Sequence, residues 1–312
     1  MMKNGTDPSH LRIPILVGPT GVGKSETAFH LALRLKAEII SADAFQVYQG
    51  MEIGTAQPPL NWREQVPHHL VGVREPTDEW NAAEFARAAK TIIDQRTVEG
   101  KRVLVVGGAG FYIKALVEGL PPGAAPSAEI RAMVAGEVQK IGNEKAHEWL
   151  EKRDPQAASR IHLNDGFRIS RALEKTYDST TVSPDFSALG GESVSFIGLE
   201  RSRENLDQRL RIRTQSMWDK GLLYETEVFI KKGISHAHPL FKAIGYFEAF
   251  NFLMKKMTSE EAIERIFRRT RQYAKRQWTW FKHQHTVCWI NLDNFPDISS
   301  VVNELEKIIK GG

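Results

Sequence analysis

A glycine-rich segment near the N-terminus constrains this chain more than any other feature. Residues 18–25 read GPTGVGKS and match the pattern G-x4-G-K-S in full. The apolar run Ile13–Val17 precedes them, and a helical pattern from Ala28 to Leu35 follows. A strand, this loop and a helix in that order are the context in which the pattern forms a phosphate-binding loop. The segment therefore predicts an anion site at the carboxyl end of a strand.

Each residue type in this loop suits a phosphate ligand. Glycines let successive backbone N–H groups turn toward an anion, and the following helix N-terminus adds positive potential. Lys24 can neutralise phosphate oxygens, and the Ser25 hydroxyl can bind a bridging Mg²⁺. We therefore expect Mg²⁺ as the cofactor, with Ser25 as its protein ligand. The pattern is typical of ATP- and other nucleotide-binding proteins, so it indicates phosphate but not the reaction.

The carboxylate that would accompany this loop is harder to assign. P-loop proteins usually hold Mg²⁺ with an aspartate at the end of an apolar strand. The apolar run Arg102–Val106 ends instead in Gly107 and Gly108, and Asp43 follows the predicted strand Glu38–Ser41. Asp43 can assist Mg²⁺, act as a base, or simply cap a helix or turn. The residues alone leave these three roles open.

The distribution of strands and helices predicts an α/β fold. Apolar strands alternate with helical patterns, which favours a P-loop NTPase-like parallel sheet flanked by helices. The segment Gly119–Pro126 has linker composition, Ser127–Tyr177 is helical in pattern, and Asp178–Ser193 is polar. A strand resumes at 194–199. We therefore predict a core of residues 1–119 and 194–312, with an inserted all-helical subdomain at 120–193. Further helices are expected at 82–93, 204–232, 259–282 and 298–309, and a last strand at 286–291.

Positive charge is concentrated near the C-terminus, although the formal net charge is only +4. The segment 265–282 contains seven basic residues and no acidic one, and Trp278, Trp280 and Phe281 are interleaved with them. Basic residues bind phosphate backbones, and aromatic rings stack on unpaired bases. The arginines therefore predict an RNA-binding surface, whereas the aromatic residues fit the protein core equally well.

Several other classes of site are disfavoured. Cys288 is the single cysteine, so no intrachain disulfide or CxxC zinc site is expected, and its apolar neighbours predict a buried strand residue. The pairs His68–His69 and His283–His285 are interpreted as structural rather than metal-binding. Residues 1–10 lack the apolar stretch of a signal peptide, and no run approaches the ~20 apolar residues of a membrane span. We expect a cytoplasmic protein.

An ordered set of short motifs resembles the tRNA dimethylallyltransferase family. It covers about residues 12–282 and is far more specific than a P-loop alone. Besides the P-loop, the set consists of Asp43–Tyr48, Gly50–Ala56, Pro67–Leu70, Gly107–Tyr112, Asp154–Pro155, Arg160–His162, Arg168–Glu174, Ile244–Tyr246 and Thr270–Gln277.

The resemblance implies an activity and its partners. The family transfers a dimethylallyl group from dimethylallyl diphosphate to the N6 amine of the adenosine 3′-adjacent to the anticodon in tRNA, releasing diphosphate. It implies a monomer without an obligate protein partner, in which the helical insertion contacts the anticodon stem-loop. The P-loop would then bind the diphosphate through Gly18, Pro19, Thr20, Gly21, Val22, Gly23, Lys24 and Ser25.

The resemblance also assigns individual roles. Asp43 matches the catalytic base, Thr20 adds a hydroxyl donor, and Arg213 rather than Arg209 matches the arginine that contacts the diphosphate. Gln46 matches the residue that reads the adenine edge. The residues implied in tRNA binding are Asp43, Ala44, Phe45, Gln46, Ala109, Phe167, Arg168, Ile169, Ser170, Arg171, Lys275 and Arg276.

Two positions depart from the family pattern. Ala109 replaces a threonine whose hydroxyl would lie near the diphosphate, and Ala44 replaces a common serine. Loss of one donor at a developing charge lowers a rate on the order of 10²-fold. Two alternatives therefore remain: a kinase or prenyltransferase acting on free nucleotides, and a non-catalytic RNA-binding protein with a decayed P-loop. The basic C-terminal segment argues against the first, and intact Lys24, Ser25 and Asp43 argue against the second.

Overall fold

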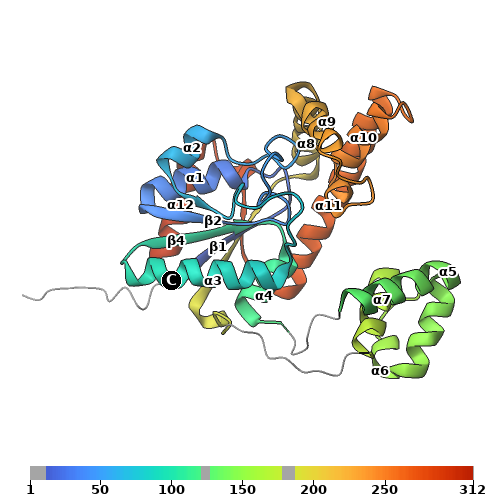
Figure 1. Ribbon diagram of the computed structural model, residues 1–312. Helices are drawn as coiled ribbons and strands as arrows, with labels where there is room; N and C mark the ends of the chain where they lie inside the picture. Colours follow the sequence, from blue (N-terminus) through green and yellow to red (C-terminus); the bar gives the residue numbers. More distant parts are fainter. Residues whose placement is uncertain (1–11, 121–126, 178–186, 312) are drawn as a thin grey trace, which may run out of the picture. The chain divides into compact units, whose positions relative to one another are not determined.

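Six parallel strands form one sheet in the order β3-β2-β4-β1-β5-β6 (Figure 1). The computed structural model describes residues 12–120, 127–177 and 187–311. The strands are β1 Ile13–Val17, β2 Ala37–Ala42, β3 His68–His69, β4 Arg102–Gly107, β5 Val194–Glu200 and β6 Cys288–Asn291. The central strands are almost continuously apolar, as expected of a parallel sheet covered on both faces. The predicted α/β class is confirmed.

Helices cover both faces of the sheet (Figure 1). On one face lie α1 (Lys24–Leu35), α2 (Leu60–Gln65) and α12 (Ile298–Gly311), and on the other α3 (Ala82–Val98) and α4 (Gly110–Glu118). The apolar stripe predicted for α1 is buried, and Leu31 and Leu35 share a core cluster with Val302 and Leu305 of α12. This packing fixes the start of α1, and with it the phosphate-binding loop.

Three strands end beside one another at the carboxyl edge of the sheet. Strand β4 lies between β1 and β2, and all three run in the same direction. The segments that begin with Gly18, Asp43 and Gly108 follow these strands directly. Ligands of open parallel sheets bind at this edge, so the topology brings the sequence motifs together.

A second group of helices lies beyond this edge. It comprises α8 (Arg203–Met217), α9 (Leu223–Lys231), α10 (Tyr246–Leu253) and α11 (Ser259–Gln284). The single helix expected at 204–232 is divided by a π-helical turn, η3 (Trp218–Leu222), in which Gly221 has a φ of 125°. Short 3₁₀ turns are η2 (Gly191–Ser193), η4 (Pro239–Lys242) and η5 (Leu292–Asn294).

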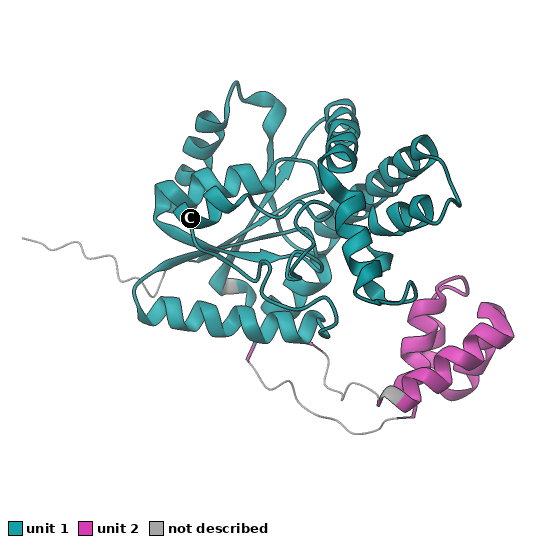
Figure 2. Cartoon of the chain, turned by 45° about the horizontal axis from the view of Figure 1, so that its top comes forward, with its two compact units in different colours: residues 1–119, 188–312 teal, residues 120–187 magenta. Residues whose placement is uncertain are grey.

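The insertion is a compact unit of residues 120–187 (Figure 2). Its helices are α5 (Ala128–Arg153, interrupted at Gly142), α6 (Pro155–Ala158) and α7 (Gly166–Lys175). Val134, Leu150, Ile169 and Leu173 form part of its own apolar core. The expected linker at 119–126 and polar stretch at 178–193 lie largely outside the described residues.

The second boundary of the insertion falls earlier than the sequence predicted, at residue 187 instead of 193. The reason is a pair of backbone hydrogen bonds to the end of α4. Leu189 N donates to Leu116 O at 3.1 Å, and Gly190 N donates to Val117 O at 3.0 Å. Residues 188–193 therefore belong to the core.

One local prediction is wrong, and one strand was not predicted. Cys288 is exposed, because it begins β6, an edge strand with a neighbour on one side only. His68 and His69 form the short edge strand β3, which the sequence pattern did not reveal. Their structural role is supported, since His69 Nε2 lies 2.6 Å from a Glu38 carboxylate oxygen and His68 Nδ1 lies 2.7 Å from Val66 O.

Two kinds of feature are missing from the part of the chain that the structure describes. No group of three or more His, Cys, Asp and Glu side chains is arranged to hold a metal ion. None of its helices combines the length and apolar character that crossing a membrane requires.

Candidate active site

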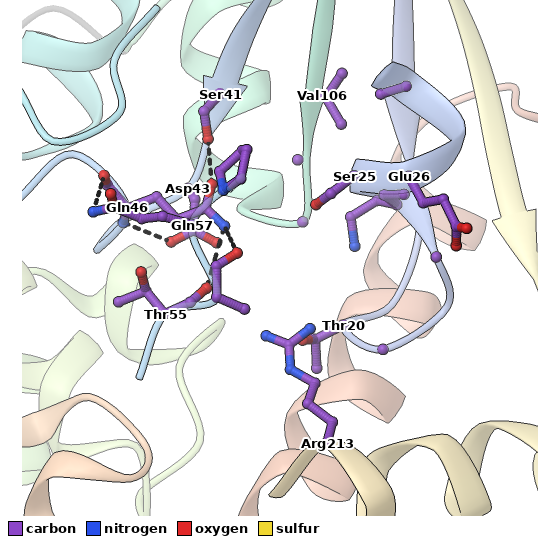
Figure 3. A pocket seen from close by; sticks show the side chains of 18 of the residues that line it. Thr20, Ser25, Glu26, Ser41, Asp43, Gln46, Thr55, Gln57, Val106 and Arg213 are labelled. Carbon is purple, nitrogen blue, oxygen red and sulfur yellow. Dashed lines mark hydrogen bonds between the residues drawn. The ribbon is translucent and has the colours of Figure 1, made fainter. Parts of the chain in front are cut away.

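A pocket of about 540 Å³ lies at the carboxyl edge of the sheet (Figure 3). The P-loop forms one wall and the turn after β2, with Asp43 and Gln46, forms another. Helix α8 contributes Arg209 and Arg213, and α11 contributes Tyr273 and Gln277. In Figure 3 the side chain of Asp43 lies across the pocket from Ser25. The predicted anion loop and carboxylate therefore share one cavity.

The P-loop backbone depends on glycine at its first position. Gly18 has a φ of 146°, and a Cβ there would lie 2.5 Å from Leu199 O on the neighbouring strand β5. Any other residue would separate β1 from β5 or distort the loop. The strand pairing of the core therefore restricts the conformation in which the loop amides are presented.

Lys24 lies at the base of the pocket in an unfavourable place for a cation. Its Nζ donates hydrogen bonds to Gly18 O and Pro19 O, both at 2.9 Å. Burial lowers the pKa of Lys24 from 10.5 to about 7, and the charge of Arg213 adds to the shift, while Asp43 opposes it. Basic side chains that converge in one cavity, as Lys24 and Arg213 do here, are what a polyanion binds.

Asp43 combines a structural contact with access to the pocket. Its Oδ1 accepts hydrogen bonds from Phe45 N at 2.9 Å and Gln46 N at 3.2 Å. The turn-capping role that the sequence left open is therefore real, and it fixes the orientation of the carboxylate. Burial, with Asp43 as a further cause, raises the pKa of Tyr112 and Tyr273, so both phenols stay protonated beside the carboxylate.

The two arginines of α8 have different environments. Arg209 Nε donates to Gly21 O at 3.0 Å, which ties the helix to the P-loop. Arg213 extends its guanidinium into the pocket (Figure 3). Burial is the main cause that lowers its pKa, and its charge interacts favourably with Asp43. The geometry supports Arg213 as the arginine that faces a bound anion.

The Gln46 side chain is held in one orientation. Its Nε2 donates to Thr55 O and Ala56 O, each at 3.2 Å, and its Oε1 accepts from Ser41 Oγ at 2.8 Å. Two carbonyl oxygens on one side can be contacted only by the NH₂ end of the amide, so the positions of Oε1 and Nε2 are determined. Gln46 therefore presents a defined edge beside Asp43.

The Ser25 hydroxyl and the Asp43 carboxylate are among the oxygen atoms of the pocket lining that could bind a hard cation. Both line the pocket, and Glu26 lies beside Ser25. Hydroxyl and carboxylate oxygens are ligands that Mg²⁺ prefers, together with phosphate oxygens of a substrate. The donor set fits the expected cofactor.

Gln277 is a site residue to which the sequence assigned no role. It is buried on α11, where its Oε1 accepts from Thr20 N at 2.8 Å and its Nε2 donates to Gly108 O at 3.0 Å. It thus joins the P-loop to the end of β4. The available signal was a polar residue in the otherwise apolar stripe of Ile266, Phe267, Ala274 and Phe281.

The candidate RNA-binding residues of the insertion divide into exposed and buried ones. Phe167 is 74% exposed, and the guanidinium carbon of Arg171 lies 5.7 Å from the centroid of the Phe167 ring. Arg168 is exposed and pairs with Asp165 at 3.4 Å. Ile169 is fully buried in the core of the insertion, so its side chain serves packing there, and its contact with RNA stays a prediction. Ser170 Oγ donates to Gly166 O at 2.8 Å, within its own helix.

The basic segment of α11 carries less free charge than its sequence indicated. Arg265 and Arg269 pair with the buried Glu248 of α10, and Arg271 pairs with Asp207 of α8. The absence of acids within the segment 265–282 did not reveal these partners, because the acids come from other helices. Lys275 and Arg276, further along the same helix, are exposed.

The Trp and Phe residues of α11 and the candidates Ala44, Phe45 and Ala109 do not line the pocket. Phe281 is fully buried in the core, whereas Trp278 is half-buried and its Nε1 donates to Glu200 at 3.2 Å. Ala109 is the N-cap of α4, and its N–H donates to Ala42 O at 3.3 Å. Ala44 and Phe45 are partly buried in the turn after Asp43.

The fold and the pocket define a P-loop α/β protein whose candidate site lies at the carboxyl edge of a parallel sheet. Two family models match the chain: one described as IPP transferase over residues 46–284, and one described as isopentenyl transferase over residues 11–67. The chain therefore belongs to the IPP transferase family.

Similar proteins extend along the whole chain. The tRNA dimethylallyltransferase of Alkaliphilus oremlandii is 36% identical over 96% of this chain and 97% of its own length. The tRNA dimethylallyltransferase 2 of Geotalea uraniireducens is 38% identical over 97% and 99%. The crystal structure of the tRNA isopentenylpyrophosphate transferase of Bacillus halodurans matches with a TM-score of 0.68 and 32% identity, over 96% and 97% of the two chains.

Proposed function

We propose that this protein transfers a dimethylallyl group from dimethylallyl diphosphate to the N6 amine of the adenosine 3′-adjacent to the anticodon in tRNA. The observation that carries the proposal is the placement of Asp43 and Arg213 with the P-loop in one pocket. The relatives named tRNA dimethylallyltransferase, similar over nearly the whole chain, support it. The protein acts as a cytoplasmic monomer whose partners are tRNA and dimethylallyl diphosphate.

The diphosphate is bound as the leaving group. The loop amides, Lys24 and Arg213 surround it, and Thr20 lines the pocket beside them. As the bond between the prenyl carbon and the diphosphate oxygen breaks, the electron pair passes to the diphosphate, whose growing charge these groups stabilise. Ser25, together with diphosphate oxygens, would hold Mg²⁺, which supplies further stabilisation of that charge when bound.

Asp43 acts as the base. The exocyclic amine of adenine is a weak nucleophile, so it benefits from losing a proton as the new C–N bond forms. The carboxylate oxygen Oδ2, which does not take part in capping the turn, accepts that proton. Gln46, held beside Asp43, reads the adenine edge.

The RNA reaches this pocket with its target base outside the stack. Enzymes that modify a base within a structured nucleic acid extrude the nucleotide into their pocket. The exposed residues Phe167, Arg168 and Arg171 of the insertion bind the anticodon stem-loop. Lys275 and Arg276 of α11 contact its phosphates.

Mass analysis of nucleosides tests the proposal. Unmodified tRNA is incubated with the protein, Mg²⁺ and dimethylallyl diphosphate, then digested, and prenylated adenosine is quantified. We expect one modified adenosine per substrate tRNA, a loss of at least 10²-fold in Asp43→Asn, and no dependence on ATP. Transfer to free AMP with equal efficiency would contradict the tRNA assignment, and absence of any transfer by the wild-type protein would overturn the proposal.

A further inference from the structure

We propose that Glu225 is a positioning residue for the base-reading side of the pocket. Its buried carboxylate anchors the segment Met51–Gln57, and this segment fixes the amide of Gln46. The inference rests on the proposed function, because it assigns Glu225 an effect on the use of the tRNA substrate. Glu225 itself does not line the pocket, so it acts through the segment that it holds.

The carboxylate of Glu225 accepts three hydrogen bonds. Ile53 N donates to Oε1 at 2.6 Å, and Gly54 N donates to Oε2 at 3.0 Å. The hydroxyl of Tyr246 also donates to Oε2, at 2.7 Å. Glu225 is only 7% exposed, and burial raises the pKa of its carboxyl, which these three donors oppose. Because charge-assisted bonds are the stronger class, one side chain of α9 can determine where two adjacent backbone amides lie.

The packing around these amides leaves little freedom. Tyr246 is fully buried, and a Cβ added to Gly54 would lie 2.4 Å from its ring. Any side chain at position 54 would therefore displace the segment from the ring or from the carboxylate. The backbone of Ile53 and Gly54 is held by a hydrogen-bond acceptor and by a close steric contact.

The next two residues transmit this position to the pocket. The carbonyls of Thr55 and Ala56 accept both hydrogen bonds from Gln46 Nε2. Ala56 has a φ of 50°, a left-handed conformation that costs a non-glycine residue roughly 1–2 kcal/mol. Gln57 Nε2 closes the segment by donating to Gln46 O at 2.9 Å and to Tyr48 O at 2.8 Å. A shift of Gly54 would thus rotate the carbonyls that orient Gln46.

The same helical stretch carries Arg213, which faces the diphosphate side of the pocket. The π-helical turn η3 lies between Arg213 on α8 and Glu225 on α9. A π-helical turn changes the direction of the side chains that follow it, and such turns are common at functional sites. With this turn, α8 directs an arginine to the pocket while α9 directs a carboxylate to the segment 51–57. Both walls of the pocket are therefore held by one continuous segment of the chain, α8–η3–α9.

Steady-state kinetics of Glu225→Gln test the proposal. A glutamine can still accept from Ile53 N, but its NH₂ group faces the donor Gly54 N–H. We expect the KM for an anticodon stem-loop to rise about tenfold, while the KM for dimethylallyl diphosphate changes by less than about twofold. Hydrogen exchange of the Ile53 and Gly54 amides should accelerate by a similar factor, and this readout does not depend on turnover.

Thr226→Val provides the matched control. Thr226 is the next residue of α9, is fully buried, and its Oγ1 bonds only Leu222 O within the helix, at 2.8 Å. It should change neither KM nor the exchange of the two amides. Tyr246→Phe keeps the ring against Gly54 and removes one of the three hydrogen bonds to the Glu225 carboxylate. We expect the KM for RNA to rise about threefold. If Glu225→Gln does not fold, the KM of Tyr246→Phe tests the positioning role instead.

The outcomes separate the two proposals. Wild-type protein that prenylates nothing would overturn the proposed function, while faster exchange of the Ile53 and Gly54 amides in Glu225→Gln would still support the anchor. Wild-type protein that prenylates RNA, with Glu225→Gln indistinguishable from Thr226→Val, would overturn the positioning role. Equal rises in both KM values would also overturn it, because they indicate a general loss of structure.

Discussion

Binding of a diphosphate to this protein should be accompanied by uptake of a proton at Lys24. The pKa of Lys24 is lowered from 10.5 to about 7, chiefly by burial and then by Arg213. At ~1.36 kcal/mol per pKa unit, the cavity disfavours the ammonium by about 5 kcal/mol. At pH 8, roughly one Lys24 in eleven is then protonated. A bound diphosphate restores the ordinary pKa, so about 0.9 proton should enter at pH 8 and about 0.5 at pH 7.

Titration calorimetry in two buffers of different ionisation enthalpy measures this number directly. Lys24→Arg is the control, since a guanidinium stays protonated and only the ligand's own protonation remains. Equal proton uptake by both proteins would refute the reasoning, as would a Lys24 pKa near 10 in an NMR titration of the free protein. The sign for stability follows from the same shift. Between pH 7 and pH 10 the unfolded chain binds more protons, so the Lys24 contribution to stability should increase as the pH rises.

Two substitutions test other contacts of the pocket. Arg213→Lys should lower kcat/KM about 10²-fold, because it removes the planar guanidinium from the diphosphate. Arg209→Lys should lower kcat/KM about tenfold or less. Equal losses in steady-state kinetics would contradict the assignment of Arg213. Gln277→Met leaves the Thr20 N–H without its acceptor and removes one of the two hydrogen bonds to the Gly108 carbonyl, which still accepts from Gly110 N. It should reduce the free energy of unfolding by about 1–3 kcal/mol. Denaturant unfolding measures it against Gln272→Met, an exposed site on the same helix, and identical values would contradict the bridge.

The sequence predicted those parts of the fold that depend on local pattern. Apolar runs located the long strands and the P-loop between β1 and α1, because a buried parallel strand and a phosphate loop have local signatures. The strand order has no such signature, since pairing joins distant segments such as β1 and β5. The division of the helix at 204–232 was missed, because Gly221 alone is compatible with an unbroken helix. Cys288 was misplaced for a related reason: its exposure depends on β6 lying at the edge.

The site could be predicted only as far as its motifs extend. The resemblance marked Asp43, Lys24 and Gln46, which lie in short recognisable segments, and the structure brings them into one pocket. The contacts that hold them come from far along the chain: Gln277 is 257 residues from Thr20, and Glu225 is 172 residues from Ile53. A buried glutamine or glutamate in an amphipathic helix does not reveal its partner without a tertiary structure.

The hydrogen bonds between the end of α4 and residues 189–190 determine how the insertion is attached. The chain leaves the core after Gly119 and returns at Ala188, and a Cβ placed on Gly119 would touch that of Ala188 at 3.6 Å. The two connections to the insertion thus lie side by side, and the core of residues 1–119 and 188–312 is one compact unit although it is interrupted in sequence. Helices could be gained, lost or lengthened between these two connections during evolution without moving any strand that supports the pocket.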